Sequence, residues 1–176
     1  MNRPQQDKDK VMNRYLFSLL AIAGIGTAYA GEAKVTWQNP DSYTDVRPAS
    51  ESKTGFQARV FKTLAGVFNS LAKQLPDGYK LQITVTDLDL AGDVKPMRGG
   101  MQDVRVIKDI DWPQISFSYV LSDPQGKQVA AAKEELRDIN FRSGVSINTG
   151  NSFYYEEAML KDWFKKQQDK KLFPAK

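Results

Sequence analysis

The chain has 176 residues, of which 25 are Lys or Arg and 21 are Asp or Glu, and it contains no cysteine and no histidine. The lack of cysteine excludes disulfides, thiol catalysis and thiolate metal sites, and the lack of histidine excludes a Ser-His-Asp triad and the usual zinc hydrolase ligands. The formal net charge of +4 is too small to indicate a nucleic-acid partner, which calls for a stronger basic surplus on one face.

Residues 1–30 have the pattern of a cleaved signal peptide. Arg14 precedes an apolar run over residues 15–26, and Ala28 and Ala30 have the small side chains and the spacing of a signal peptidase site. The run is shorter than the roughly 20 apolar residues that span a bilayer. We therefore expect an exported chain in which residues 31–176 form a single domain without a transmembrane segment.

The first elements of this domain are predicted to be a strand, a loop and a helix. Residues 34–38 alternate apolar and polar side chains, which favours a strand, and the turn-forming residues 39–50 favour a loop. Over residues 56–75, apolar side chains recur every three or four positions, which predicts an amphipathic helix. Thr54 and Gln57 have capping-box spacing at its start, and Pro76-Asp77-Gly78 is a typical helix end.

The next predicted strand contains an irregularity. Leu81, Ile83 and Val85 alternate with polar residues, but Leu88 and Leu90 fall on the opposite parity. A β-bulge absorbs one extra residue and restores the facing, so we place a bulge, or the end of the strand, at Thr86-Asp87. Residues 91–102 contain glycine and proline and are predicted to be a loop.

The second half of the chain predicts more strands and a final helix. An extended segment restarts at residues 104–106, residues 115–121 alternate, and Asp123-Pro124-Gln125-Gly126 is typical of a tight turn. Residues 127–141 favour helix by composition, whereas their place after the turn favours a returning strand, which we prefer. Residues 155–164 predict a helix capped by Asn151 or Ser152. The expected fold is α+β, with a mostly antiparallel sheet of about four strands and two helices on one face.

Several phrases resemble a known family of exported bacterial proteins. In chain order they read VTWQNPDSYTDVR, VTDLDLAGD, DVRVIKDIDWPQI, EELRDINF and EEAMLKDWF. Together they are similar to the domain of unknown function, family 3016. The resemblance implies secretion in Gram-negative bacteria and hence a periplasmic location, and it implies no activity, substrate or cofactor.

The aspartates of VTDLDLAGD were the first candidates for a metal site. If Asp87 takes position 1 of an EF-hand loop, then Asp89 and Gly92 fit positions 3 and 6. Position 5 is then Ala91, however, and position 12, where the loop needs a bidentate glutamate, is Arg98. Met97 and Met101 have the soft sulfur of a copper ligand, but with no histidine or cysteine beside them they are more typical of loop anchors.

The remaining candidates concern catalysis and ligand binding. Carboxylate pairs such as Asp87 and Asp89 serve in glycoside hydrolysis, but such pairs are also common at solvated strand ends. We therefore assign no catalytic, cofactor-binding or metal-binding residue. Instead we expect an acidic rim, available to a cationic partner, at Asp87, Asp89, Asp93, Arg98 and Arg105. The three tryptophans have the rings that stack on sugars, but core packing is the preferred interpretation for Trp37, Trp112 and Trp163.

The preferred function is therefore a non-catalytic binding or interaction module of the bacterial cell envelope. Its expected partner is an envelope protein or polymer that the sequence does not identify, and no cofactor is expected. Two alternatives stay open: a carboxylate-dependent enzyme that acts on an envelope polymer, and a calcium-stabilised structural module.

Overall fold

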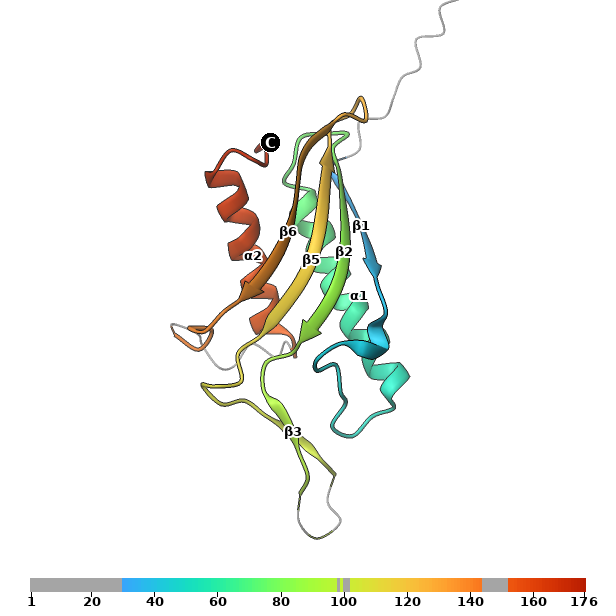
Figure 1. Cartoon of the computed structure of the whole chain (residues 1–176), viewed down its shortest axis with the longest axis vertical. Helices are drawn as coiled ribbons and strands as arrows, with labels where there is room; N and C mark the ends of the chain where they lie inside the picture. Colours follow the sequence, from blue (N-terminus) through green and yellow to red (C-terminus); the bar gives the residue numbers. More distant parts are fainter. Residues whose placement is uncertain (1–29, 98, 100–101, 144–151) are drawn as a thin grey trace, which may run out of the picture.

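A computed structural model describes residues 30–97, 99, 102–143 and 152–176 of the chain (Figure 1). The predicted signal peptide therefore lies outside the described residues, with Ala30 at their boundary. Arg98, Met101 and Asn151, which took part in the sequence predictions, also lie outside them.

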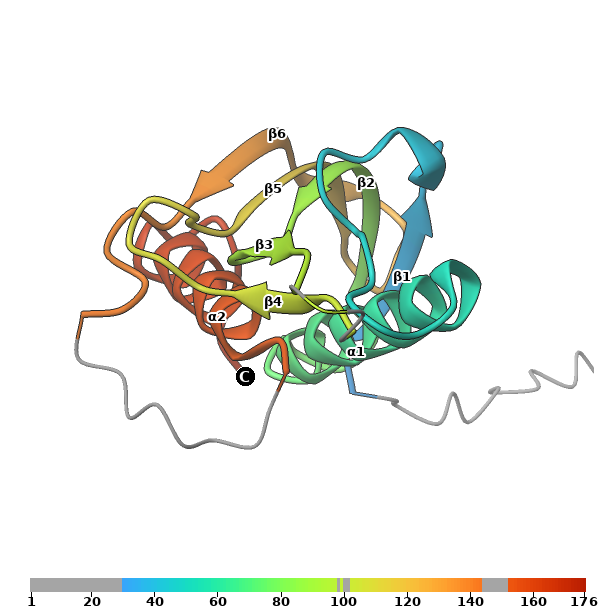
Figure 2. The same cartoon turned by 90° about the horizontal axis from the view of Figure 1, so that it is seen from below.

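The main body is a four-stranded sheet with two helices on one face (Figures 1 and 2). The strands have the order β1-β2-β5-β6, with β1 at Glu32–Trp37, β2 at Lys80–Asp89, β5 at Gln114–Ser122 and β6 at Gln128–Arg137. β1 runs parallel to β2, and the other pairs are antiparallel. The helices are α1 at Lys53–Ala72 and α2 at Tyr154–Asp169. The predicted α+β class, with a mostly antiparallel sheet, is confirmed.

A second, two-stranded sheet projects beyond the end of β2 as an arm (Figure 1). It pairs β3 at Asp93–Lys95 with β4 at Val104–Val106, so the prediction of loop throughout residues 91–102 was wrong for β3. Gly92 permits the close approach of the two strands: its φ is +83°, and a Cβ there would lie 2.7 Å from the carbonyl oxygen of Val106.

The core lies between the helices and the sheet and is rich in aromatic side chains. Trp163 of α2 makes edge contacts with Phe117 and Tyr119 of β5 and with Phe173, at ring-centroid distances of 5.0, 5.7 and 5.6 Å. Edge-to-face pairs of this kind stabilise a core beyond the area that they bury. Trp37 stacks on Phe61 at 4.4 Å. Both tryptophans therefore pack in or against the core, as expected.

Trp112 lies elsewhere, half-exposed beneath the Arg137 guanidinium at 5.9 Å. A cation over an indole face is weakly attracted to it. This tryptophan therefore packs at the end of the sheet and not in the core.

The helix starts differ from the predicted ones by a few residues. Ser52 caps α1, because its hydroxyl accepts a hydrogen bond from the Gly55 backbone N–H at 3.1 Å. The capping box expected at Thr54 and Gln57 was therefore wrong, since both residues lie inside the helix. The N-cap of α2 is Phe153 and has no side-chain cap bond, so Ser152 does not cap this helix.

The returning strand preferred for residues 127–141 is confirmed as β6 over most of its length. The turn before it is closed by the Gly126 N–H, which donates to the Asp123 carbonyl at 2.9 Å. Pairing then runs from Ser122 opposite Gln128 to Gln114 opposite Arg137. The turn chemistry therefore outweighed the helix propensity of the alanines and glutamates.

The predicted bulge in β2 is confirmed. The register between β2 and β5 shifts between Val85 and Asp87, so that Thr86 and Asp87 together oppose Ser116. The extra residue returns Leu88 to the core, where it is 0% exposed, whereas Asp87 and Asp89 stay partly exposed. Burying two carboxylates on the core face would have cost several kcal/mol each, which is the physical reason for the bulge.

Substitutions at the bulge test which side chains face the core and which face outward. We expect Leu88→Ala to lower the free energy of unfolding by about 2–5 kcal/mol, because it leaves a cavity in the core. Asp87→Asn leaves no cavity and keeps one acceptor oxygen for Thr44, so it should cost less, about 1 kcal/mol for the weakened hydrogen bond. Denaturant melts of both variants test this, and a large loss from Asp87→Asn with little from Leu88→Ala would contradict the facing.

Candidate functional site

The loop between β1 and α1 crosses the end of β2 and holds the bulge. The Tyr43 hydroxyl donates to the Val85 carbonyl at 3.0 Å, and the backbone N–H and hydroxyl of Thr44 both donate to the Asp87 carboxylate at 2.7 Å. Asp45 then pairs in parallel with Asp89 through two backbone hydrogen bonds. The loop thus continues the sheet where β1 has ended.

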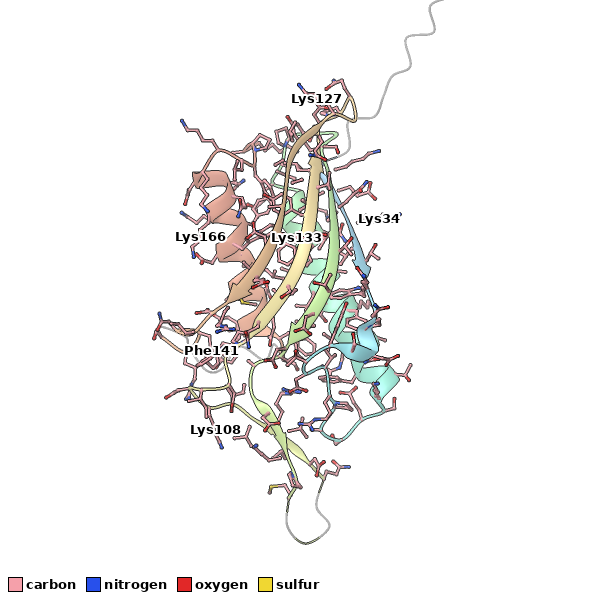
Figure 3. The ribbon with its side chains drawn as sticks, viewed as in Figure 1. Lys34, Lys108, Lys127, Lys133, Phe141 and Lys166 are labelled. Atoms are coloured by element: carbon pink, nitrogen blue, oxygen red, sulfur yellow. The ribbon has the colours of Figure 1, made fainter. Side chains whose placement is uncertain are left out.

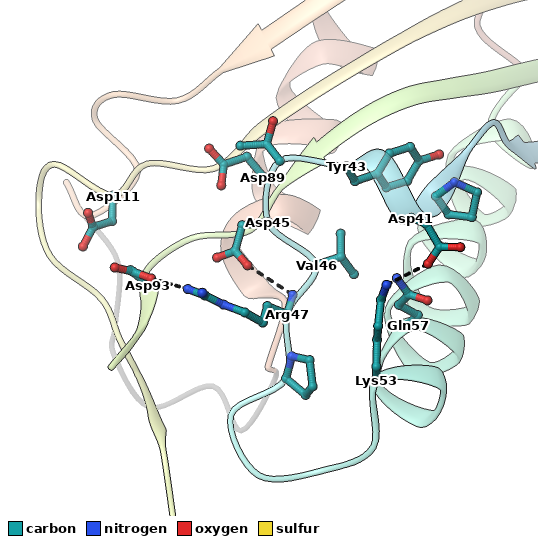
Figure 4. A pocket seen from close by; sticks show the side chains of 13 residues that line it. Asp41, Tyr43, Asp45, Val46, Arg47, Lys53, Gln57, Asp89, Asp93 and Asp111 are labelled. Atoms are coloured by element: carbon teal, nitrogen blue, oxygen red, sulfur yellow. Dashed lines mark hydrogen bonds and ion pairs between the residues drawn. The ribbon is translucent and has the colours of Figure 1, made fainter. Parts of the chain in front are cut away.

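A cleft of about 670 Å³ opens between this loop, the start of α1 and the base of the arm (Figure 4). Aspartates from four segments of the chain converge on it, and its cationic lining residues are Arg47 and Lys53. The aspartates that line it are Asp41, Asp45, Asp89, Asp93 and Asp111. Acidic side chains therefore outnumber basic ones in the lining.

Three of these aspartates are paired with a cation. Asp41 accepts from Lys53 at 2.8 Å, Asp93 accepts from Arg47 at 2.8 Å and from Lys95, and Asp45 accepts from Arg105 at 3.0 Å. The two remaining lining carboxylates belong to Asp89 and Asp111.

Asp89 accepts only an amide hydrogen bond, from Gln114 at 3.1 Å. The Asp111 carboxylate has no hydrogen-bond or ion-pair partner among the described residues. The cleft consequently carries uncompensated negative charge.

Arg105 joins the arm to the cleft. Its guanidinium donates to the Asp45 carboxylate, to the Gly92 carbonyl at 2.8 Å and to the Arg47 carbonyl at 2.8 Å. Arg105 was predicted to belong to an acidic rim with Asp87 and Asp89, but the carboxylate that it pairs with is Asp45, which the loop after β1 brings to the base of the arm.

Of the five predicted rim residues, Asp89 and Asp93 line the cleft. Arg105 does not line it but donates a hydrogen bond to the lining residue Asp45. Asp87 lies in a neighbouring polar depression of about 520 Å³, which Asp89 also lines, on the outer face of the sheet. Arg98 lies outside the described residues. Asp41, Asp45 and Asp111 also line the cleft but were not among the predicted rim residues, because their local sequence does not show that they lie near Asp89 in the fold.

The electrostatics differ among the cleft carboxylates. Burial, and then the neighbouring Asp45 charge, raise the pKa of Asp89. The hydrogen bond from Lys53 lowers the pKa of Asp41, and the hydrogen bond from Lys95 lowers that of Asp93. Burial raises the pKa of Tyr43 to about 12, which keeps its hydroxyl a hydrogen-bond donor to the bulge. Asp89 is therefore the cleft carboxylate whose raised pKa makes it ready to take a proton or meet a cation.

Glu156 is a buried carboxylate that sequence reasoning did not single out. It lies in the first turn of α2, is 3% exposed, and accepts a hydrogen bond from the Ala91 N–H at 2.8 Å. Burial raises its pKa, and the hydrogen bond from Ala91 opposes that shift. The sequence predicted a buried apolar face for this helix. It did not predict that Glu156, a charged residue next to that face, is buried as well. Glu156 ties α2 to the segment that leaves β2.

Within the described ranges, no group of three or more Asp or Glu side chains is arranged to hold a metal ion. Met97, one half of the soft-metal candidate, is 44% exposed. None of the described helices is long and apolar enough to cross a membrane.

The buried Glu156 predicts a pH dependence of stability. Because its pKa is higher in the folded than in the unfolded chain, the folded state binds the proton more tightly, and this contribution to stability is lost as the pH rises through the folded pKa. We expect Glu156→Gln, which keeps an oxygen for Ala91, to have its largest stability gain over the wild type near neutral pH and little gain below the unfolded pKa. Denaturant melts across this range measure it, and a loss of stability at neutral pH would contradict it.

Comparisons with known proteins place the chain in a family. No curated protein and no solved structure matches it. The family model described as "Protein of unknown function (DUF3016)" matches residues 31–166, which covers every helix and strand described above apart from the last residues of α2. The chain therefore belongs to the DUF3016 family.

Proposed function

We propose that this protein is an exported, non-catalytic binding module of the bacterial cell envelope and that its acidic cleft binds a cationic ligand. The observation that carries the proposal is the cleft lining, in which five aspartates converge and two of them, Asp89 and Asp111, have no cationic partner among the described residues. The chain as a whole has a positive formal charge, so the negative charge is a local property of this surface.

The chemistry of the cleft favours a ligand with ammonium or guanidinium groups. Asp89 is half-buried and Asp111 is without a cationic partner in the described part of the chain, so a cation placed between them replaces water with charge-assisted hydrogen bonds. The cleft walls are held in place by the bulge and by Arg105, so little ordering is needed on binding. A cationic segment of an envelope protein or polymer has this chemistry.

Export is supported by the arrangement at the start of the domain. The signal peptidase pattern ends at Ala30, and β1 begins at Glu32. Gly31 packs tightly, since a Cβ there would lie 2.2 Å from the Ala72 carbonyl oxygen. Cleavage after Ala30 would therefore remove the apolar segment and leave every strand and helix of the domain intact.

A carboxylate-dependent enzyme is the second candidate. Burial and the neighbouring Asp45 raise the pKa of Asp89, and the Asp45 carboxylate lies in an ion pair with Arg105. A carboxyl group with a raised pKa in a cleft is the usual form of a general acid. The cleft thus has one element of an acid–base site, at Asp89 and Asp45.

The binding proposal predicts that spermidine, used as a probe, binds the cleft in isothermal titration calorimetry at low ionic strength. The double variant Asp89→Asn and Asp111→Asn should weaken binding at least about tenfold, because it removes the two carboxylates without a cationic partner. Asp169→Asn on α2 is the matched control and should leave the affinity unchanged. Equal affinity of the double variant and the wild type would contradict the proposal. Release of reducing ends from purified peptidoglycan by the wild type, lost in Asp89→Asn, would favour the enzyme.

Export itself predicts a defined start of the mature protein. When the whole chain is produced in a Gram-negative host, the periplasmic fraction should contain a protein that begins at Gly31, because signal peptidase requires the small side chains of Ala28 and Ala30. Intact-mass measurement checks this. As a control, Ala30→Phe should block processing, and a periplasmic species that retains residues 15–26 would contradict the prediction.

A further inference from the structure

A second cavity lies where both helices begin, at the base of the arm. It has a volume of about 270 Å³ and is here called the Glu156 pocket. Its lining includes Phe56, Arg59, Leu90, Ile107, Phe153 and Glu156. The starts of α1 and α2 and the base of the arm lie at the same end of the sheet (Figure 1). Figure 3 shows Lys108, which follows Ile107 in the chain, at this end of the molecule and Lys127 at the other.

Apolar side chains from three segments form one part of the pocket wall. Phe56 of α1 and Phe153 at the start of α2 meet edge to face, with ring centroids 6.1 Å apart, and Leu90 adds an aliphatic side chain from the end of β2. All three side chains are buried. Ile107 is 38% exposed and Ser50 is exposed, so the pocket opens to solvent. Drug-sized ligands occupy sites of roughly 300 Å³ or more, so this pocket fits a smaller ligand, on the order of ten non-hydrogen atoms.

The two positive charges of the lining already have partners. The Arg59 guanidinium lies over both phenylalanine rings, 5.2 Å from each centroid, and forms an ion pair with Glu51. Arg105 forms an ion pair with Asp45 and also donates to the backbone carbonyls of Gly92 and of the loop after β1. Each guanidinium charge is therefore offset by a carboxylate of the protein itself.

The Glu156 carboxylate has no such partner in the described part of the chain, where it forms no ion pair. Its one hydrogen bond from another described residue is the Ala91 N–H at 2.8 Å. A carboxylate has lone pairs for several donors, and a buried one without a cation is costly to keep. A buried carboxylate in the wall of an apolar cavity is therefore a candidate binding group, and the negative charge of the pocket belongs to it.

We propose that the Glu156 pocket binds a small primary amine with an apolar body, whose ammonium group pairs with the Glu156 carboxylate. The body then lies against Phe56, Leu90 and Phe153 and leaves water. The ammonium supplies the missing cation, and their charge-assisted hydrogen bond is strong because the pocket keeps both groups away from bulk water. This site is separate from the acidic cleft, since the two cavities share no lining residue among those described.

The same residues disfavour other classes of ligand. An anion would meet the Glu156 carboxylate, while both guanidinium groups are already paired. A polyamine such as spermidine would have to place a second ammonium against the apolar wall, where burial of an unpaired charge is costly. A neutral alcohol with the same body can still donate to Glu156, but it does not supply the compensating charge.

The probe for the test is 2-phenylethylamine, which joins an ammonium group to a phenyl ring. In isothermal titration calorimetry at neutral pH, the purified protein should bind it at least about tenfold more tightly than 2-phenylethanol, in which a hydroxyl replaces the ammonium. Ethylamine, which lacks the ring, should not bind at the same concentrations. In NMR spectra, nuclear Overhauser contacts should join the ring of the probe to methyl groups of Leu90 and Ile107. Equal affinity for the amine and the alcohol would overturn the proposal, as would contacts only to methyl groups outside the pocket.

Matched variants test the role of the carboxylate. Glu156→Gln keeps the shape of the side chain and removes its charge, so it should weaken binding of 2-phenylethylamine at least about tenfold and remove the preference for the amine over the alcohol. Glu157→Gln, at the next position of α2 and outside the lining, is the control and should leave the affinity unchanged. Because Glu156→Gln is expected to fold at least as stably as the wild type, a loss of binding reports on the site. Equal binding of the probe by Glu156→Gln and the wild type contradicts the proposal.

A second pair of variants tests the location of the site. Ala49→Trp fills the pocket from the loop before α1 and should also weaken binding of the probe, whereas Ala58→Trp, on the exposed face of α1, should not. The double variant Asp89→Asn and Asp111→Asn, which alters the acidic cleft, should still bind 2-phenylethylamine. If this double variant loses the probe, or if Ala49→Trp binds it as well as the wild type, the amine does not occupy the Glu156 pocket.

Discussion

The rest of the structure depends on one extra residue in β2. At Thr86 and Asp87 two residues oppose the single Ser116, which turns Leu88 back to the core and sends Asp87 and Asp89 to the other face. The residues on either side of the extra one then bind the loop after β1. The Val85 carbonyl accepts from the Tyr43 hydroxyl and the Gln38 N–H, and the Asp87 carboxylate accepts from Thr44. The loop after β1 is thus held at the end of β2, where it forms a wall of the cleft.

Buried polar groups then fix the other walls. Arg105 donates to one carboxylate and to backbone carbonyls of two segments, and Glu156 accepts from Ala91 next to one of them. An ion pair such as Arg105–Asp45, with side chains that are 19% and 14% exposed, adds little net stability by itself, but losing one partner leaves a poorly solvated charge. Such a network therefore specifies the geometry of the loop, the arm and α2 more than it strengthens the fold.

The features that were predicted correctly are those that depend on a local pattern of residues. The parity change after Val85 located the bulge, and the spacing of apolar residues located both helices. Prediction was weaker where the outcome rests on distant contacts. Nothing near Asp45 or Asp111 in the chain signals that they line one cleft with Asp89. Asp45 reaches it only after β1 and β2 pair in parallel, and Asp111 only through the segment between β4 and β5. The burial of Glu156 likewise depends on the segment after β2, which lies 65 positions away in sequence.

The two edges of the sheet differ in a way that bears on function. At the β1 edge, Asn69 of α1 accepts a hydrogen bond from the Ala33 N–H at 3.2 Å, so a side chain of the protein itself occupies a free backbone group there. β1 is also short, with six residues. β6 has ten residues, and α2 lies beside it without satisfying its backbone. Edges are normally kept short or covered because an open one recruits other strands. β6 carries the charged side chains of Lys133, Glu134 and Glu135 along its length, and charges of this kind discourage other strands from adding to an open edge.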